Sequence, residues 1–196
     1  MKHLLYALLT AVSILFTSCG PSSNTNNPQV PNVPQPQPQP QPEVTQKVVI
    51  GYLALDDWEF ENLFPTIEWK YLTHINASFA RVKADGTLNI EPVRKRIESV
   101  RETAHKHNVK ILISLAKNSP GEFTTAINDP KARKELIQQI IAFTKEYKLD
   151  GFDIDYEEYD NWDKNFPSLL VFARGLYLAK EKNMLMTCAV NTRWLN

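Results

Sequence analysis

The sequence LDGFDIDYE at residues 149–157 decides the fold, because it combines the composition of a buried strand with acids at alternating positions. Side chains in a strand point alternately to its two faces. Asp153, Asp155 and Glu157 therefore share one face, while the aromatic and aliphatic residues between them share the other. A strand inside a parallel sheet is normally apolar on both faces. Three acids in line on such a strand indicate a functional site.

Similar apolar runs, rich in Val, Ile and Phe and bounded by turn residues, occur on both sides of this stretch. The predicted strands are Val48–Ala54, His74–Val82, Val109–Leu115, Gly151–Glu157 and Met184–Asn191. Amphipathic segments with apolar residues at steps of three and four lie between them and predict helices. Strands that alternate with helices in this way indicate parallel strands joined by right-handed crossovers.

Two α/β architectures fit this order, an open doubly wound sheet and a closed (β/α)8 TIM barrel. No Gly-x-Gly-x-x-Gly follows the first strand, which argues against a dinucleotide-binding sheet. Barrel enzymes carry their functional groups at the C-terminal ends of the strands, where Glu157 lies. We therefore predict a TIM barrel. A complete barrel takes about 250 residues, so residues 45–196 would supply only about its first five units, and we expect this chain to be poorly active or inactive alone.

The three aligned acids also predict a particular chemistry. Carboxylates on an inner face lose hydration and repel one another, which raises the pKa of at least one of them. A carboxylic acid that stays protonated near neutral pH can act as a general acid, and Glu157 is the best placed. A solvated edge strand fits less well, because the helical segments on both sides make this strand central. A divalent-metal site also fits less well, because three acids on one straight strand cannot easily surround an ion. We expect Glu158 and Asp160 to be solvated acids where the strand ends.

Residues 150–157, DGFDIDYE, resemble the D-x-x-D-x-D-x-E motif of family 18 of the glycoside hydrolases, which includes chitinases and endo-β-N-acetylglucosaminidases. Gly51-Tyr52 is similar to the Gly-Tyr of that family's first strand, and residues 72–80 are similar to its second strand. Ile113-Ser114 resembles the start of the family's Ser-x-Gly-Gly. There the match is partial, because Ala116-Lys117 replace the two glycines.

The resemblance implies a role for each matching residue. Glu157 corresponds to the general acid and base, and Asp155 to the residue that orients and polarises the substrate's N-acetyl group. Asp153 corresponds to the acid that shares a proton with its neighbour, and Tyr52 and Ser114 to its hydrogen-bond partners. Family 18 uses a substrate-assisted mechanism, so the resemblance implies retaining hydrolysis with no metal or organic cofactor.

The implied partner is a glycan that contains N-acetylglucosamine. Chitin, its oligomers and the chitobiose core of N-glycans remain open as substrates, and the oligomeric state is not predicted. A non-catalytic, lectin-like glycan-binding protein on the same scaffold is the alternative, although such proteins commonly lose the acid that Glu157 supplies. Asp150 falls on the opposite face of the strand by parity, and we expect it to be structural.

Two tryptophans follow predicted strands and could stack on sugar rings. Trp58 comes after the first strand and Trp194 after the fifth, so both could reach the face where the strands end. Trp69, in a helical stretch, is expected in the core, while the pattern around Trp162 favours neither role. Cys188 is expected to be a buried, unpaired thiol.

The N-terminal fifth of the chain predicts export rather than fold. Residues 1–18 combine a charged start with a short apolar run, as in a signal peptide. The sequence FTSC at residues 16–19 resembles a bacterial lipobox, so Cys19 would carry the lipid that anchors the protein to a membrane. Residues 19–44 turn to alternating Pro and Gln, which favour an extended tether.

These features together predict an exported lipoprotein of the bacterial cell envelope, with the outer membrane as the favoured location. Among the 196 residues, Lys plus Arg and Asp plus Glu are both 22, so the formal net charge is zero. This balance gives no indication of a nucleic-acid partner.

Overall fold

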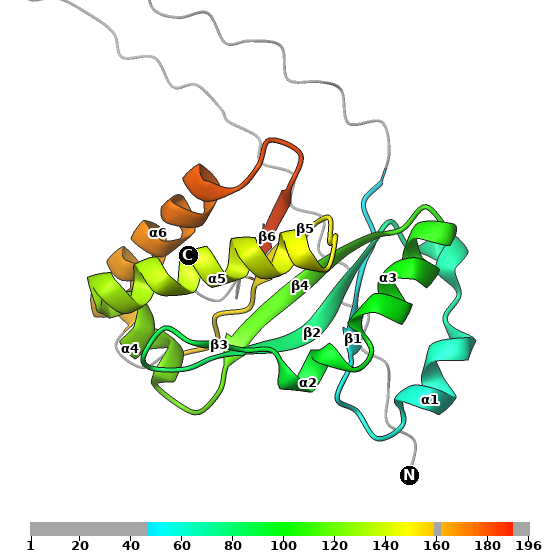
Figure 1. Ribbon diagram of the computed structural model, residues 1–196, viewed down its shortest axis with the longest axis horizontal. Coiled ribbons are helices and arrows are strands. Elements are labelled where there is room, and N and C mark those ends of the chain that lie inside the picture. The colour runs from blue at the N-terminus through cyan, green and yellow to red at the C-terminus, as the bar shows by residue number, and fades with distance from the viewer. Residues whose placement is uncertain (1–46, 159–161, 190–196) are drawn as a thin grey trace, which may run out of the picture. The chain divides into compact units, whose positions relative to one another are not determined.

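The computed structural model of the protein describes residues 47–158 and 162–189 (Figure 1). The strands are β1 (Ile50–Ala54), β2 (His74–Val82), β3 (Leu88–Asn89), β4 (Lys110–Lys117), β5 (Gly151–Ile154) and β6 (Leu185–Cys188). The α-helices are α1 (Phe60–Leu63), α2 (Glu91–Arg94), α3 (Ile97–Lys106), α4 (Glu122–Asn128), α5 (Pro130–Glu146) and α6 (Trp162–Ala179). Two 3-10 turns, η1 (Phe64–Thr66) and η2 (Trp69–Tyr71), lead into β2.

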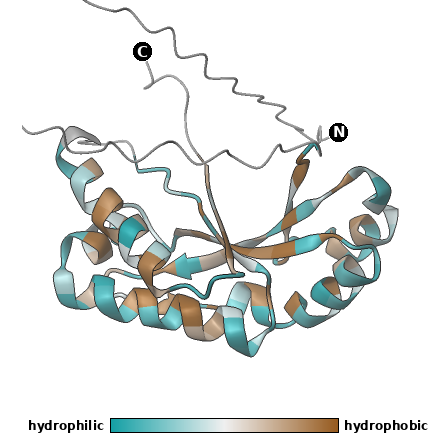
Figure 2. Ribbon diagram, turned by 90° about the horizontal axis from the view of Figure 1, so that it is seen from above, coloured by the Kyte–Doolittle hydropathy of each residue, from teal (hydrophilic) through white to brown (hydrophobic). Residues whose placement is uncertain are grey.

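The long strands form one parallel sheet in the order β1-β2-β4-β5-β6, which is also their order along the chain. The short β3 pairs antiparallel with the end of β2. A doubly wound sheet reverses its strand order at a switch point, whereas this order never reverses. In Figure 2 the helices lie along one side of the curved row of strands, as they do around a barrel. The predicted barrel-type winding is therefore present in the described residues.

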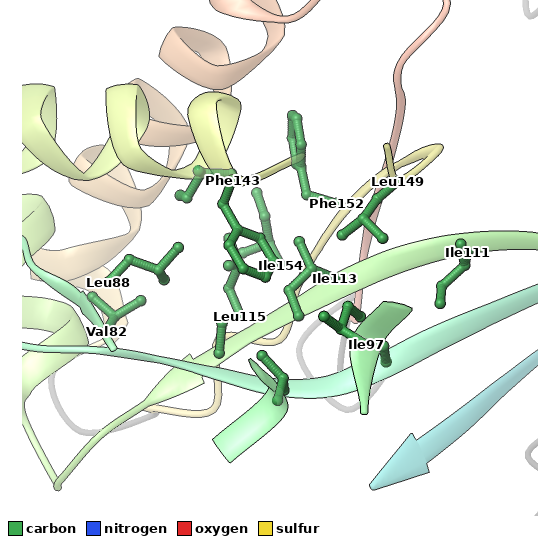
Figure 3. Close-up of a cluster of buried hydrophobic side chains, with 14 of the residues drawn as sticks. Val82, Leu88, Ile97, Ile111, Ile113, Leu115, Phe143, Leu149, Phe152 and Ile154 are labelled. Carbon is green, nitrogen blue, oxygen red and sulfur yellow. The ribbon is translucent and has the colours of Figure 1, made fainter. Parts of the chain in front are cut away.

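The core lies between the helices and the strand face that they cover. Residues at alternate positions of β4 and β5 point into it and meet side chains of α3 and α5 (Figure 3). The strand residues labelled there are Ile111, Ile113, Leu115, Phe152 and Ile154, all fully buried. Residues between them point to the other face, which places Ser114 and Asp153 away from this core.

The helical patterns of the sequence are confirmed with one difference. Val93, Ile97, Val100 and Ala104 are all fully buried, as their spacing predicts. They belong to two helices, however, because the helical conformation is interrupted between α2 and α3. Asn108 follows α3 with a φ of 58°, the left-handed conformation that commonly ends a helix.

The start of α5 also follows its sequence signal. Asp129 caps the helix by accepting a hydrogen bond of 2.7 Å from the Ala132 amide, and Pro130 occupies the first turn. On the buried side of this helix lie Leu136, Ile140 and Phe143.

One predicted strand end and one predicted core position are wrong. The strand predicted over Gly151–Glu157 ends at Ile154, because the next residues turn toward α4 and bond to it. Cys188 is exposed at the end of β6, not buried. No helix within the described residues combines the length and apolar character that crossing a bilayer requires.

Candidate active site

The centre of the site is a row of three residues on neighbouring strands. Ser114 on β4 and Thr187 on β6 are the register partners of Asp153 on β5, so all three side chains share the sheet face opposite the core. The Ser114 hydroxyl donates to Asp153 Oδ2 at 2.7 Å, and the Thr187 hydroxyl donates to Asp153 Oδ1 at 2.6 Å. Asp153 is only 1% exposed, and both of its oxygens are satisfied by these hydroxyls.

Tyr52 completes the set of donors from β1, the far edge of the sheet. Its hydroxyl donates to Asp153 Oδ2 at 2.8 Å. The residue as a whole is half exposed, while its hydroxyl is bonded to the buried carboxylate. Burial, followed by the negative charge of Asp153, raises the Tyr52 pKa well above its ordinary value, so the phenol remains a donor. The predicted pairing of Tyr52 and Ser114 with Asp153 is therefore present, while Thr187 is a partner that the sequence did not reveal.

The other two acids of the motif open into one cavity of about 410 Å³. Its lining residues are Tyr52, Ala54, Ser78, Phe79, Asp155, Glu157 and Ala189. Asp155 and Glu157 thus share one space with Tyr52, at the ends of β1, β2 and β5. A concave site with converging polar groups is what a small-molecule or glycan substrate requires.

The raised pKa expected among the three acids falls on Asp155. Burial, with the neighbouring charges of Glu157 and Asp153, raises the pKa of the Asp155 carboxyl from 3.8 to about 6. Lys117 and Arg81 act in the opposite direction and moderate that rise. Asp155 can therefore gain or lose a proton near neutral pH, which suits a group that holds a polar substituent whose charge changes during a reaction.

Two cations lie beside these acids, and one of them, Lys117, stands at a position where the family pattern has a glycine. Lys117 ends β4, and its ammonium donates to the main-chain carbonyl of Glu157 at 3.0 Å. Arg81, at the end of β2, donates to the Lys117 carbonyl at 3.5 Å and lies 3.8 Å from the Asp56 carboxylate. Two cations therefore border the acids along the strand ends.

Glu158 is not the solvated acid that the sequence led us to expect. Its carboxylate accepts from the Gly121 amide at 2.5 Å, and from the Thr124 amide at 2.6 Å and hydroxyl at 2.5 Å. The Tyr156 hydroxyl lies 2.5 Å from the same Thr124 hydroxyl. The residues on either side of Glu157 are thereby fastened to the start of α4. Asp160 lies outside the described residues.

The comparison with known proteins adds the family. The family model described as "Glycosyl hydrolases family 18" matches residues 48–193. The chain belongs to this family. Its sheet is accordingly part of a TIM barrel, and the resemblance carried by residues 150–157 is confirmed.

Three similar proteins show how much of a longer protein this chain matches. A crystal structure of a chitinase from Bacteroides thetaiotaomicron is 97% identical with a TM-score of 0.76, covering 78% of this chain and 49% of that one. Chitinase B of Serratia marcescens is 27% identical over 144 residues, which are 58% of this chain and 28% of that protein. A Cycas revoluta chitinase in complex with (GlcNAc)3 is 23% identical with a TM-score of 0.63, covering 72% of this chain and 45% of that one. The family 18 chain thus spans about half, or less, of these relatives' lengths.

Asp150, the first acid of the motif, lies at the opposite end of β5 and is structural, as parity predicts. Its carboxylate accepts from Lys110 at 2.8 Å and from the Ile111 amide at 2.9 Å, and contacts His105 at 2.7 Å. Burial alone would raise the Asp150 pKa, but hydrogen bonds from Lys110, Ile111 and His105 outweigh it and lower the pKa. This group fastens α3 and β4 to the start of β5.

The aromatic predictions have mixed outcomes. Trp69 is buried and stacks on His107 with ring centroids 5.5 Å apart, so its place in the core is confirmed. Trp58 is 83% exposed on the segment after β1, which leaves its indole free of the core. Trp194, Cys19 and the side chain of Trp162 lie outside the described residues.

Within the described part of the chain, no three or more His, Cys, Asp or Glu side chains are grouped so as to hold a metal ion.

Proposed function

We propose that the protein containing this chain hydrolyses β-1,4 glycosidic bonds in N-acetylglucosamine-containing glycans, with chitin and chitooligosaccharides as the favoured substrates. The observation that carries this proposal is the graded environment of the three acids. Asp153 is buried under three hydroxyl donors, Asp155 has a pKa of about 6, and Glu157 opens into the same cavity as Asp155. Membership of family 18 and the 97% identity to a solved chitinase support the choice of substrate.

In the first step of the proposed mechanism, Glu157 donates a proton to the glycosidic oxygen as the bond to the leaving sugar breaks. The carbonyl oxygen of the substrate's own acetamide attacks the anomeric carbon, so that an oxazolinium ion forms on the sugar. Asp155 accepts a hydrogen bond from the acetamide N–H and balances the positive charge that develops there. Asp153, held by its three donors, fixes the position of its neighbour on the same face.

In the second step, Glu157 takes a proton from a water molecule, which attacks the anomeric carbon and reopens the oxazolinium ring. Two displacements at the same carbon leave the product with the β configuration of the substrate. Tyr52 lines the cavity next to Asp155 and keeps its proton, which it donates to Asp153.

The proposal is tested with the complete protein that contains this chain, incubated with chitooligosaccharides and, in parallel, with an N-glycan that has an intact chitobiose core. We expect release of short N-acetylglucosamine oligomers, and nuclear magnetic resonance of the fresh products should show the β anomer first. An α anomer as first product would refute the substrate-assisted mechanism. Cleavage of the N-glycan alone would reassign the substrate while leaving the chemistry intact.

Glycan binding without hydrolysis is the second candidate function. Its support is the family scaffold alone. Binding of chitooligosaccharides by a complete protein that releases no product would establish it. The presence of Glu157 at the cavity favours the enzyme, because a binding protein has no need of a general acid.

We also propose that Cys19 carries a lipid that anchors the exported protein to the bacterial envelope, with residues 19–44 as its tether. The apolar run that ends in FTSC supports this placement. In cells that produce the protein, labelled palmitate should be incorporated into the wild type and not into Cys19→Ala, and the variant should leave the membrane fraction. Absence of label from the wild type would refute the anchor.

A further inference from the structure

The chain segment that carries Glu157 leaves the sheet just before the acid. The last backbone hydrogen bond of the β4–β5 ladder runs from the Asp155 amide to the Leu115 carbonyl, at 3.0 Å. After that bond, the contacts that connect residues 156–158 to the neighbouring segment involve side chains. A general acid must be held to within a fraction of an ångström of its working position, so these contacts have a bearing on catalysis.

Two charged side chains hold this segment at and just after the acid. The Lys117 ammonium reaches from β4 to the Glu157 carbonyl at 3.0 Å. The Glu158 carboxylate is fastened to Gly121 and Thr124 by three hydrogen bonds of 2.5–2.6 Å. Charge-assisted hydrogen bonds of this kind are stronger than neutral ones. Neither side chain takes part in the proposed chemistry.

We propose that Lys117 and Glu158 are positioning residues for Glu157, which fix the main chain at the acid's own carbonyl and at the residue that follows it. This inference rests on the proposed function. Lys117 stands where the family pattern has a glycine, so this chain has a side chain where that pattern has none. A glycine cannot make the bond to the Glu157 carbonyl, and the positioning by Lys117 is therefore a property of this chain.

The base of Lys117 is itself well fixed, which allows its side chain to act as a brace. Lys117 pairs with Val82 in the β2–β4 register, and the amide that follows it, from Asn118, donates to the Val82 carbonyl at 3.0 Å. Arg81 adds a bond of 3.5 Å to the Lys117 carbonyl. The guanidinium of Arg81 in turn lies 5.0 Å from the Phe79 ring centroid, on the cavity wall. Three strand ends are thus connected through Lys117.

The Lys117 ammonium also places a positive charge near the acids. The charges that face the Asp155 carboxyl come from several elements of the sheet and have both signs. The titratable and charged groups around it are Tyr52 on β1, Arg81 on β2, Lys117 on β4, Asp153 on β5, Glu157 beyond β5 and Cys188 on β6. Removing the Lys117 ammonium takes away a positive charge, so the pKa of Asp155 should rise further above about 6.

The chain offers a matched control at the other end of the same strand. Lys110 begins β4 and bonds to Asp150 before β5, as Lys117 ends β4 and bonds to Glu157 after β5. Lys110→Met and Lys117→Met each keep the aliphatic stem and lose one ammonium contact to the β5 segment. A loss of stability from a missing ammonium contact is possible in both variants and is measured as Tm, while an effect on the acid belongs to Lys117 alone.

The experiment compares these variants, Lys117→Arg and Glu158→Gln with the wild type in the complete protein, using kcat and KM on chitooligosaccharides. Misplacement by about 1 Å can cost up to about 100-fold in rate. We expect Lys117→Met and Glu158→Gln to lower kcat about 10- to 100-fold while KM changes little. Lys117→Arg should retain most of the wild-type kcat, and Lys110→Met should leave kcat unchanged. Equal losses in Lys117→Met and Lys110→Met, or an unchanged kcat in Lys117→Met, would overturn the proposal.

Amide hydrogen exchange separates this inference from the proposed function. The amides of Gly121 and Thr124, which donate to the Glu158 carboxylate, should exchange faster in Lys117→Met than in the wild type and Lys110→Met, whether or not the protein hydrolyses chitin. A wild type without glycosidase activity would refute the proposed function, and the exchange rates would still decide whether Lys117 holds the segment. Unchanged exchange in Lys117→Met would refute the brace even in an active enzyme.

Discussion

The Tyr52 hydroxyl donates a hydrogen bond of 2.8 Å to Asp153, although the two residues are 101 positions apart in the sequence. The bond joins the edge strand β1 to the acid at the centre of the sheet, passing over β2 and β4. It therefore depends on the curvature of the sheet as much as on the two side chains. A change at Tyr52 should consequently affect both stability and the placement of the acids.

We expect Tyr52→Phe to lower the free energy of unfolding by about 1–2 kcal/mol, because a buried carboxylate loses one of its donors. In the same variant, kcat on chitooligosaccharides should fall. Urea unfolding followed by tryptophan fluorescence measures the first effect. Tyr71→Phe is the control, because that tyrosine is largely exposed and should lose nothing. Equal stability of the two variants would show that the bond to Asp153 contributes little.

The glycine of the DG pair in the motif has a steric role that can be tested separately. A Cβ added at Gly151 would lie 2.0 Å from the Leu185 carbonyl oxygen, so β5 and β6 could not remain paired there. Overpacking typically costs about 1–3 kcal/mol, and we expect Gly151→Ala to reach at least the upper end. Gly51→Ala is the matched strand control, because its Cβ would meet only the flexible Leu72 side chain at 3.4 Å. If the two variants unfolded at the same urea concentration, the claim that β6 leaves no room for a Cβ at Gly151 would be wrong.

The pKa of Asp155 makes a prediction about pH. Its value in the folded protein, about 6, lies above the ordinary value of 3.8, so between these two values the folded state holds more protons than the unfolded state. Stability from this group is therefore lost as pH rises from about 4 to about 6, and the ionised carboxyl destabilises the fold above that range. Asp155→Asn should raise Tm at pH 7 to 8, and the gain should shrink as pH falls through 6 toward 4. A gain that does not change with pH would contradict the raised pKa.

Much of the site could be predicted from the sequence because the signals are local. The period of a strand places Asp153, Asp155 and Glu157 on one face, and the same parity separates Asp150 from them. The remaining partners could not be predicted in this way. Thr187 and Glu158 bond to residues 34–37 positions away, which are brought together by strand register for Thr187 and by the packing of α4 beside the end of β5 for Glu158.

The errors have a similar origin. The alternating pattern of residues 149–157 continues past Ile154, but the contacts of Tyr156 and Glu158 with Thr124 pull the chain out of the sheet. Tertiary contacts thus overrode a local preference for strand. The apolar neighbours of Cys188 predict a buried thiol, whereas the structure exposes it where β6 ends.

Trp58 makes a prediction that separates binding from folding. Its indole is 83% exposed on the segment after β1, and we expect it to stack on a sugar ring of a bound oligomer. Trp58→Ala should weaken chitooligosaccharide binding about tenfold, which corresponds to about 1.4 kcal/mol, while Tm stays the same. Titration calorimetry with the complete protein measures the change. Binding equal to that of the wild type would remove Trp58 from the glycan site.

The role of Glu157 is tested most directly by the turnover number of Glu157→Gln on chitooligosaccharides, measured in the complete protein beside the wild type. General acid catalysis contributes about 10²- to 10⁴-fold. Because Glu157 acts in both steps, kcat should fall by a factor in this range or by a larger one. Binding of the oligomer should be retained, and Glu135→Gln, an exposed change on α5, should leave kcat unchanged. A Glu157→Gln variant that turns over substrate at the wild-type rate would contradict the account.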